Sequence, residues 1–292
     1  MRRLVCVLVA TGGLSSGGAA AADVTPGAPL RATVLEMTIG GTTTRTVAQV
    51  RSAVIDRRRN PPTEPGADRF AQPQIAAPRL QVVVAFPPSS MPLPLVQAFF
   101  DGTAVDGAVD LYFGANPAQS GRRACSFDDA VVTEVTLPAL DAGSSAEGFV
   151  LVAFKAAAFR RGGTAGSLPA GWATSTRFFL NNFRFTGSGD PDATAIVSVE
   201  PIVFRQRVAR GPIESPTVAV WVSEQGTGAA TFDTWFDAGR ERPATLELLS
   251  QSQRALLTID FQSVEPIAAH QVPNDQRMRR FDVHVGHFGV RR

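Results

Sequence analysis

The residues with the greatest capacity for catalysis or metal binding are three histidines near the C-terminal end of the chain, His270, His284 and His287. His284 and His287 form an H-x-x-H pair, but residues three apart on a strand point to opposite faces, so the pair cannot grip one zinc ion. His270 could act as a base only beside a nucleophile, and no Gly-x-Ser-x-Gly elbow occurs after residue 22. The sequence therefore predicts surface histidines and no catalytic triad.

Two acidic pairs are the next candidates. Asp190 and Asp192, in Gly-Ser-Gly-Asp-Pro-Asp, resemble an acidic calcium loop, but a polar hairpin turn explains the same residues and is the favoured interpretation. Asp128 and Asp129 lie close to Cys125. Adjacent residues on a strand diverge, so we expect one of these carboxylates to cap or hydrogen-bond a neighbouring loop.

The tryptophans could form a sugar-stacking platform or fill a core. Trp221 and Trp235 fall at positions where core packing is expected, whereas Trp172 stays open between the two roles. No glycine-rich phosphate cradle follows a strand and opens a helix. The sequence therefore predicts no catalytic, cofactor-binding or metal-binding residue, no cofactor, and a protein that is not an enzyme.

The first 22 residues read as a secretory signal peptide. Arg2 and Arg3 supply a positive start, a short apolar stretch follows, and Ala19–Ala22 offers small residues for cleavage before Asp23. We therefore expect a periplasmic or extracellular protein, or a cytoplasmic one if Met1 is a mis-called start. No later segment has the roughly 18 consecutive apolar residues of a membrane helix.

Charge and cysteine content narrow the class of protein further. Removing Arg2 and Arg3 lowers the basic count from 28 to 26, equal to the 26 acidic residues. A neutral mature chain argues against a nucleic-acid or polybasic membrane partner. Cys6 leaves with the signal, so Cys125 has no internal disulfide partner and stability must come from an apolar core.

Strand patterns dominate the mature chain. Apolar residues alternate with polar ones over 257–261 and 281–285, which indicates half-buried strands, while 80–86 and 149–154 are apolar on both faces. Helical spacing appears only in two short stretches, Pro92–Asp101 and Thr231–Asp237. The pattern predicts a mainly β protein with two short helices.

These elements form an internal repeat. Val82 matches Val218 and Val96 matches Phe232, both with an offset of 136, since 218 − 82 and 232 − 96 agree. In the same repeat, the strand over 127–138 is matched with 256–266, and the strand over 149–154 is matched with 281–287. An opening hairpin over 32–55, turned at Gly40-Gly41, is matched with a hairpin over 178–204, turned at 187–190. The sequence predicts two tandem small β-barrel domains, each with one flanking helix, at 23–155 and 174–292, joined by a linker over 156–173. The segment 56–79 is predicted to be an extended loop, with a shorter arginine- and proline-bearing counterpart over 205–216.

The pattern resembles the tail-tube proteins of contractile-tailed phages and related injection systems. It is carried by the aromatic pairs Phe99-Phe100 and Trp235-Phe236, each ending a short helix, and by the strand over 127–141 that ends in Leu-Pro-Ala-Leu-Asp. Together with Trp172-Ala173-Thr174-Ser175 and Asn182-Phe183-Arg184-Phe185, that strand is similar to bacterial two-domain "phage tail protein" sequences over residues 30 to 290. Tube subunits carry no secretory signal, and this chain departs from the family there.

The resemblance implies barrels of tail-tube type, six of which close side by side into a ring, with rings that stack. It also implies self-association, and sheath, baseplate or spike-like proteins as partners. A tandem duplication would let three chains supply six barrels. The predicted function is a structural, self-assembling, exported protein, and the alternative is a secreted or periplasmic binding module that uses the loops at the barrel ends.

Overall fold

The computed structural model describes residues 33–56, 79–113, 121–162, 176–187, 195–206, 210–225, 228–271, 277–286 and 288–291. The predicted signal peptide and Trp172, Asp190, Asp192 and His287 lie outside these residues, as does nearly all of the predicted 56–79 loop. The described part is mainly β, as the sequence predicts, with two sheets and two α-helices.

The first unit is the stretch from β1 to β8 together with α1. Its elements are β1 (Thr33–Ile39), β2 (Thr42–Asp56), β3 (Arg79–Phe86), the 3-10 helix η1 (Pro88–Ser90), α1 (Leu93–Phe100), β4 (Val105–Phe113), β5 (Gly121–Leu137), β6 (Leu140–Asp141), β7 (Val150–Ala156) and β8 (Ala158–Arg161).

The second unit is the stretch from β9 to β17 together with α2. Its elements are β9 (Phe183–Gly187), β10 (Ile196–Val199), β11 (Ile202–Gln206), β12 (Ile213–Glu214), β13 (Thr217–Ser223), α2 (Gly228–Ala238), β14 (Arg242–Leu249), β15 (Ala255–Gln271), β16 (Met278–Val285) and β17 (Phe288–Arg291). Both predicted helices are therefore present.

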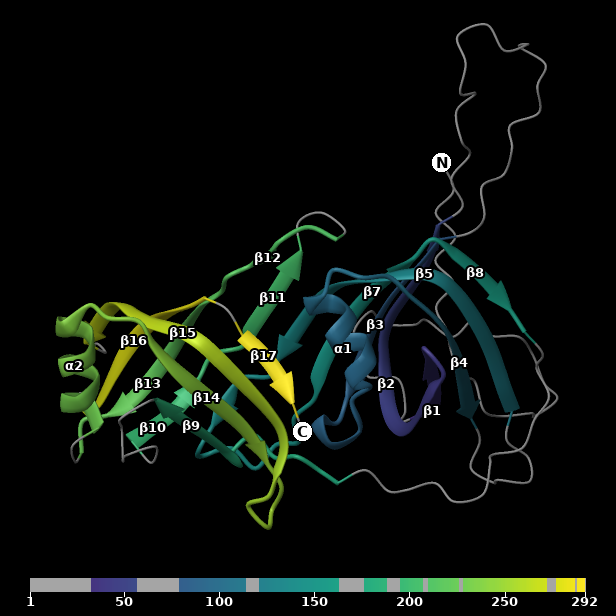
Figure 1. Cartoon of the computed structure of the whole chain (residues 1–292). Coiled ribbons are helices and arrows are strands. Elements are labelled where there is room, and N and C mark those ends of the chain that lie inside the picture. The colour runs from purple at the N-terminus through teal and green to yellow at the C-terminus, as the bar shows by residue number, and fades with distance from the viewer. Residues whose placement is uncertain are drawn as a thin grey trace, which may run out of the picture.

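Six strands of the first unit close into an antiparallel barrel (Figure 1). The order around the barrel is β5, β4, β1, β2, β3, β7 and back to β5. Gly40 and Gly41 turn the β1–β2 hairpin, as predicted, with φ of +54° and +80°, which favour glycine. The strand β5 closes the barrel because its first half pairs with β4 and its second half with β7.

A bulge lies where β5 changes partners. Asp106 of β4 faces both Asp128 and Asp129, and Asp129 has a φ of +52°. The Asp129 N–H donates to the Asp106 carboxylate over 2.8 Å, while Asp128 receives Arg160 of β8 at the same distance. The two adjacent carboxylates have different partners, Arg160 for Asp128 and Arg210 for Asp129, so they diverge as the sequence predicts. The Asp129 N–H and the Asp106 carboxylate fix the bulge.

The second sheet repeats the ladders of the first. The pairs β9–β14, β14–β15, β15–β16, β13–β16 and β10–β13 correspond to β1–β4, β4–β5, β5–β7, β3–β7 and β2–β3. The pairings give Val82 and Val218 equivalent places, opposite Phe154 and Val283, as the predicted repeat requires.

Three details differ from the sequence-based predictions. The opening hairpin of the second unit was expected to pair like β1 and β2, but β9 lies on β14 and β10 on β13, and no β9–β10 pairing occurs among the described residues. The predicted linker over 156–173 is partly strand, because Ala156 ends β7 and Ala158–Arg161 form β8, which pairs with β5. The segment 205–216, predicted to be a loop, contributes to β11 and β12, which pair with each other.

The core is one continuous cluster that runs through both units. The predicted alternation is confirmed, because Leu257, Ile259 and Phe261 of β15 are buried, as are Phe281 and Val283 of β16. Each helix packs on the long strand of its own unit, α1 on β5 and α2 on β15. Figure 1 shows α2 at the end of the molecule away from the first barrel.

Candidate assembly surface

The two units are joined by exchange of strands. β11 leaves the second sheet and pairs with the end of β5, with Phe204 opposite Val135 and Ile202 opposite Leu137. In the other direction, β6 of the first unit pairs with β10. Because the junction is made of backbone ladders, it fixes the register of one unit on the other.

An aromatic contact fills the space behind these ladders. Phe204 of β11 is buried and stacks on Phe288 of β17, with ring centroids 3.8 Å apart. Phe288 in turn meets Phe100 at the end of α1 edge-on, with centroids 4.7 Å apart. Figure 1 shows β17 lying between the second sheet and α1. The closing strand of the second unit therefore covers the helix of the first.

A buried glutamine ties the junction to the end of α1. Gln206, the last residue of β11, is buried and donates from Nε2 to the carbonyl oxygen of Phe99 over 2.8 Å. The last carbonyls of a helix lack partners within the helix, so this amide satisfies one of them. The Gln206 Oε1 accepts the N–H of Arg210 over 3.2 Å, and Arg210 adopts a φ of +64° there.

Ion pairs surround the junction. Arg205 reaches Glu134 across the β11–β5 ladder, with Nε and Oε2 2.7 Å apart, and Arg210 lies 3.8 Å from Asp129. The arginines are more than half exposed, 59% and 56%, so these pairs add little free energy and mainly select the register.

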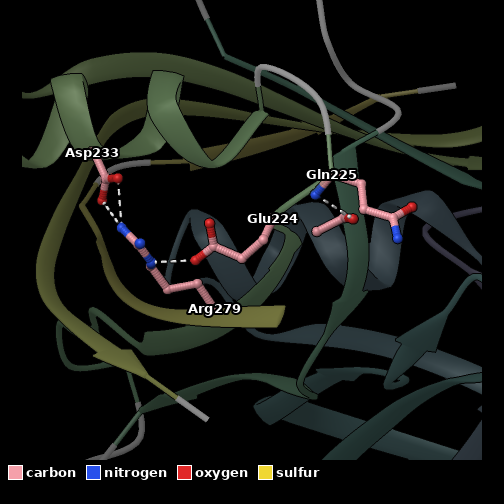
Figure 2. A network of polar contacts seen from close by, with 5 residues as sticks. Glu224, Gln225, Asp233 and Arg279 are labelled. Carbon is pink, nitrogen blue, oxygen red and sulfur yellow. Dashed lines mark hydrogen bonds and ion pairs between the residues drawn. The ribbon is translucent and has the colours of Figure 1, made fainter. Parts of the chain in front are cut away.

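The second unit holds its own helix by a different device, drawn in Figure 2. Arg279 at the start of β16 binds Asp233 of α2 with its guanidinium, and its Nε donates to Glu224 over 2.7 Å. These contacts, led by the hydrogen bond to Asp233, raise the pKa of Arg279 above its ordinary value, although partial burial opposes the shift. The cation therefore stays charged while it joins β16 to α2 and to Glu224, the residue that follows β13.

A second ion pair lies near the C-terminal end. Arg291 of β17 donates from Nε to Asp260 of β15 over 2.5 Å, and Thr245 donates to the same carboxylate over 3.3 Å. The hydrogen bond from Arg291 is the main cause that lowers the pKa of Asp260 below its ordinary value of 3.8. This pair fastens β17, the strand that covers α1.

The two described histidines, His270 and His284, lie on neighbouring strands of the second sheet, β15 and β16. His270 Nε2 lies 3.0 Å from the Asp282 carboxylate, and its side chain is 51% exposed. His284 lies on β16, opposite Thr217 on one side and Glu265 on the other. Among the described residues, no group of three or more histidine, cysteine or acidic side chains could hold a metal ion.

The tryptophan prediction is half right. Trp235 is buried, and its Nε1 donates to the carbonyl oxygen of Arg240 over 2.8 Å. Trp221 was expected in the core but is only half-buried, with the Arg280 guanidinium 5.9 Å from its ring centroid. It takes the polar-facing side because its neighbours along β13, Val220 and Val222, fill the core.

Sequence reasoning missed Gln206 and Arg279, which carry the contacts that organise the two helices. A buried glutamine at the end of a strand has no sequence signature, because its partner carbonyl lies 107 residues away in the chain. Arg279 stands among other arginines near the end of the chain, and nothing in their spacing singles it out.

Comparison of the chain with protein-family models and with curated proteins finds no match. Within the described residues, no helix is long and apolar enough to cross a membrane.

Proposed function

We propose that this protein is a structural, self-assembling protein of tail-tube type, which builds rings or tubes from its β-barrel units. The observation that carries the proposal is the junction inside the chain, where one unit adds a strand to the edge of another unit. Contacts of this kind are what a ring of side-by-side barrels would repeat between chains.

The chemistry of the junction supports an assembly role. A backbone ladder sets the register, the buried rings Phe204 and Phe288 supply apolar contact, and the exposed Arg205–Glu134 pair lies beside the ladder. Apolar centres with polar surroundings are typical of specific protein interfaces. The proposal includes export of the chain, with cleavage before Asp23, and the sheath-, baseplate- or spike-like partners that the resemblance implies.

Sedimentation of the mature protein over a range of concentrations tests the proposal. We expect species larger than one chain that grow with concentration. A single species with the mass of one chain at every concentration would overturn it. The mass of the N-terminal peptide of protein recovered from the periplasm or medium tests export separately, because a chain that retains Met1 would contradict cleavage.

A further inference from the structure

The long strand of the first unit, β5, has both edges occupied near its end, over residues 134–136. β4 pairs with β5 as far as Ala130, and β11 then pairs with Glu134–Leu137. β7 pairs with the same stretch of β5 as β11 does, so these two strands take opposite edges. The edge that β4 leaves is therefore completed by a strand of the second unit.

The long strand of the second unit lacks that completing strand. β14 pairs with β15 only as far as Val264, and β16 and β17 take the opposite edge. No strand of the described residues pairs with the β14 edge of β15 from Glu265 to Gln271. We call this unpaired edge of β15, over residues 265–271, the open edge.

The pairings show that the last four residues of the open edge are the counterpart of the edge that binds β11. Phe127 faces Gly107 of β4, and Phe261 faces Ala244 of β14, which gives an offset of 134 between the long strands (261 − 127). The register of the β5–β7 ladder shifts at Thr133, and that of the β15–β16 ladder shifts at Ile267. These two positions are also 134 residues apart (267 − 133). Residues 268–271 thus correspond to 134–137.

Backbone groups on the open edge point outward. The Gly286 N–H donates to the Ser263 carbonyl over 2.8 Å, so Ser263 faces β16. Along a strand, backbone N–H and C=O groups point alternately to one edge and the other, and the irregularity at Ile267 shifts this alternation by one residue. The backbone groups of Ala268 and His270 therefore point toward β16, and those of Ala269 and Gln271 point away from it. Natural proteins guard such edges, because they readily pair with another chain.

Several side chains on and beside the open edge are exposed to solvent. Ile267 is 51% exposed and is the one large apolar side chain of the described residues that is so exposed. Ala269 and Gln271 are exposed, whereas their counterparts Val135 and Leu137 are buried at the junction. The end of α2, from Asp237 to Arg240, is exposed too, whereas Gln206 covers the end of α1.

We propose that the open edge of β15, with the end of α2 beside it, is the docking site for the first unit of a second copy of this chain. The inference rests on the proposed function and names the surface that would carry it. One chain presents an open edge at its second unit, and a head-to-tail contact of this kind repeats until a ring closes or a filament grows.

The contact between copies is weaker than the junction inside the chain. Glu134, which pairs with Arg205, is replaced by Ala268, and the buried Val135 and Leu137 are replaced by Ala269 and Gln271. Less apolar surface and one lost ion pair lower the affinity. Assembly should therefore depend on protein concentration.

Hydrogen exchange of the whole mature protein tests the site without any substitution. We expect the amides of Ala269 and Gln271, which point away from β16, to exchange slowly in concentrated, assembled protein and rapidly after dilution. Amides over 258–261, which are paired on both edges, should stay slow throughout. Equal exchange of the Ala269 and Gln271 amides at both concentrations would overturn the proposal.

Substitutions on the open edge provide a second test of the docking site. Ala269→Pro removes an outward N–H, and Ile267→Lys places a charge on the open edge. Each should raise the concentration needed for half-assembly by about tenfold, the equivalent of one hydrogen bond. Gln262→Lys, on an exposed residue of the same strand outside the open edge, is the matched control and should leave assembly unchanged.

The outcomes separate this inference from the proposed function. Assembly that proceeds equally in both edge variants and in the control would overturn the docking site and leave the proposed function standing. A wild-type protein that never assembles would overturn both. Thermal unfolding by circular dichroism identifies a variant that fails to fold, in which case the hydrogen-exchange result decides.

Discussion

The two helices of the molecule occupy equivalent places but are held by different parts of the chain. The end of α1 is covered by the second unit, through the hydrogen bond from Gln206 to Phe99 and the edge-on contact of Phe288 with Phe100. α2 is held within its own unit, by Arg279 and by the Trp235 hydrogen bond to Arg240. The second unit thus covers the helix end and the sheet edge of the first unit, whereas the second unit holds its own helix and keeps one sheet edge open.

This difference shows how a repeat can be adapted without changing its fold. Five strand pairings of the first barrel are shared by the second unit, since they are fixed by the backbone and by apolar alternation, and only the β1–β2 pairing of that barrel lacks a counterpart among the described residues. Contacts at the helix ends are made by single side chains and can be replaced one at a time. The Arg279 network therefore substitutes, in the second unit, for the cover that the first unit receives from its neighbour.

The largest effect is expected when the contact between units is broken at Phe204. Phe204→Ala removes a buried ring that stacks on Phe288 and should cost about 3 to 5 kcal/mol of the free energy of unfolding. Calorimetry should then separate the unfolding of the two units into two transitions. A single transition with an unchanged midpoint would show that the ring does not couple the units.

A smaller loss is expected at the end of α1. Gln206→Ala leaves the Phe99 carbonyl with only the longer bond from the Gly102 N–H, 3.4 Å, and should cost about 1.5 kcal/mol. Gln225→Ala is the control, because Gln225 is exposed and only its backbone N–H bonds, to Ser223. Chemical denaturation measures both, and equal losses in the two variants would contradict the capping role of Gln206.

The second helix should respond to its own network and not to the junction. Arg279→Met removes the cation that joins Asp233 and Glu224 and should cost about 1 kcal/mol, because the site is partly exposed. Hydrogen exchange of 228–238 should rise while that of 93–100 stays the same. A rise in both helices would mean that the helices are not held independently.

The smallest effect is expected from the pair that fastens β17. Asp260 has a lowered pKa in the folded protein, so its pair with Arg291 stabilises the fold above the ordinary pKa of 3.8 and loses that contribution as the pH falls through the lowered value. Asp260→Asn should therefore be slightly less stable than wild type at neutral pH and equal to it at strongly acidic pH. A stability difference that does not change with pH would contradict this account.

Much of the architecture could be predicted from the sequence, because short-range patterns encode it. Alternation over 257–261 and the helical spacing of 92–101 and 231–237 identified strands and helices, and the offset of 136 placed Val82 with Val218. Matching 127–138 to 256–266 was wrong by five residues, because Phe127 corresponds to Phe261. The predicted strand ended at Pro266, but β15 continues through it to Gln271, and the missing N–H of Pro266 falls on the open edge.

The junction could not be predicted in the same way. β11 follows β10 after Glu200 and Pro201, and nothing local shows that it pairs with β5 rather than with its own sheet. Partner choice at a sheet edge depends on residues distant in the chain, such as Glu134 facing Arg205. The half-buried Trp221 was misplaced for a related reason, since only the sheet as a whole decides which face of β13 meets the core.

Electron microscopy of the concentrated mature protein tests the central claim most directly. The account predicts rings or tubes in which barrels repeat in pairs, each pair being one chain, joined through the open edge of β15. Particles that contain only two barrels at every concentration would contradict it.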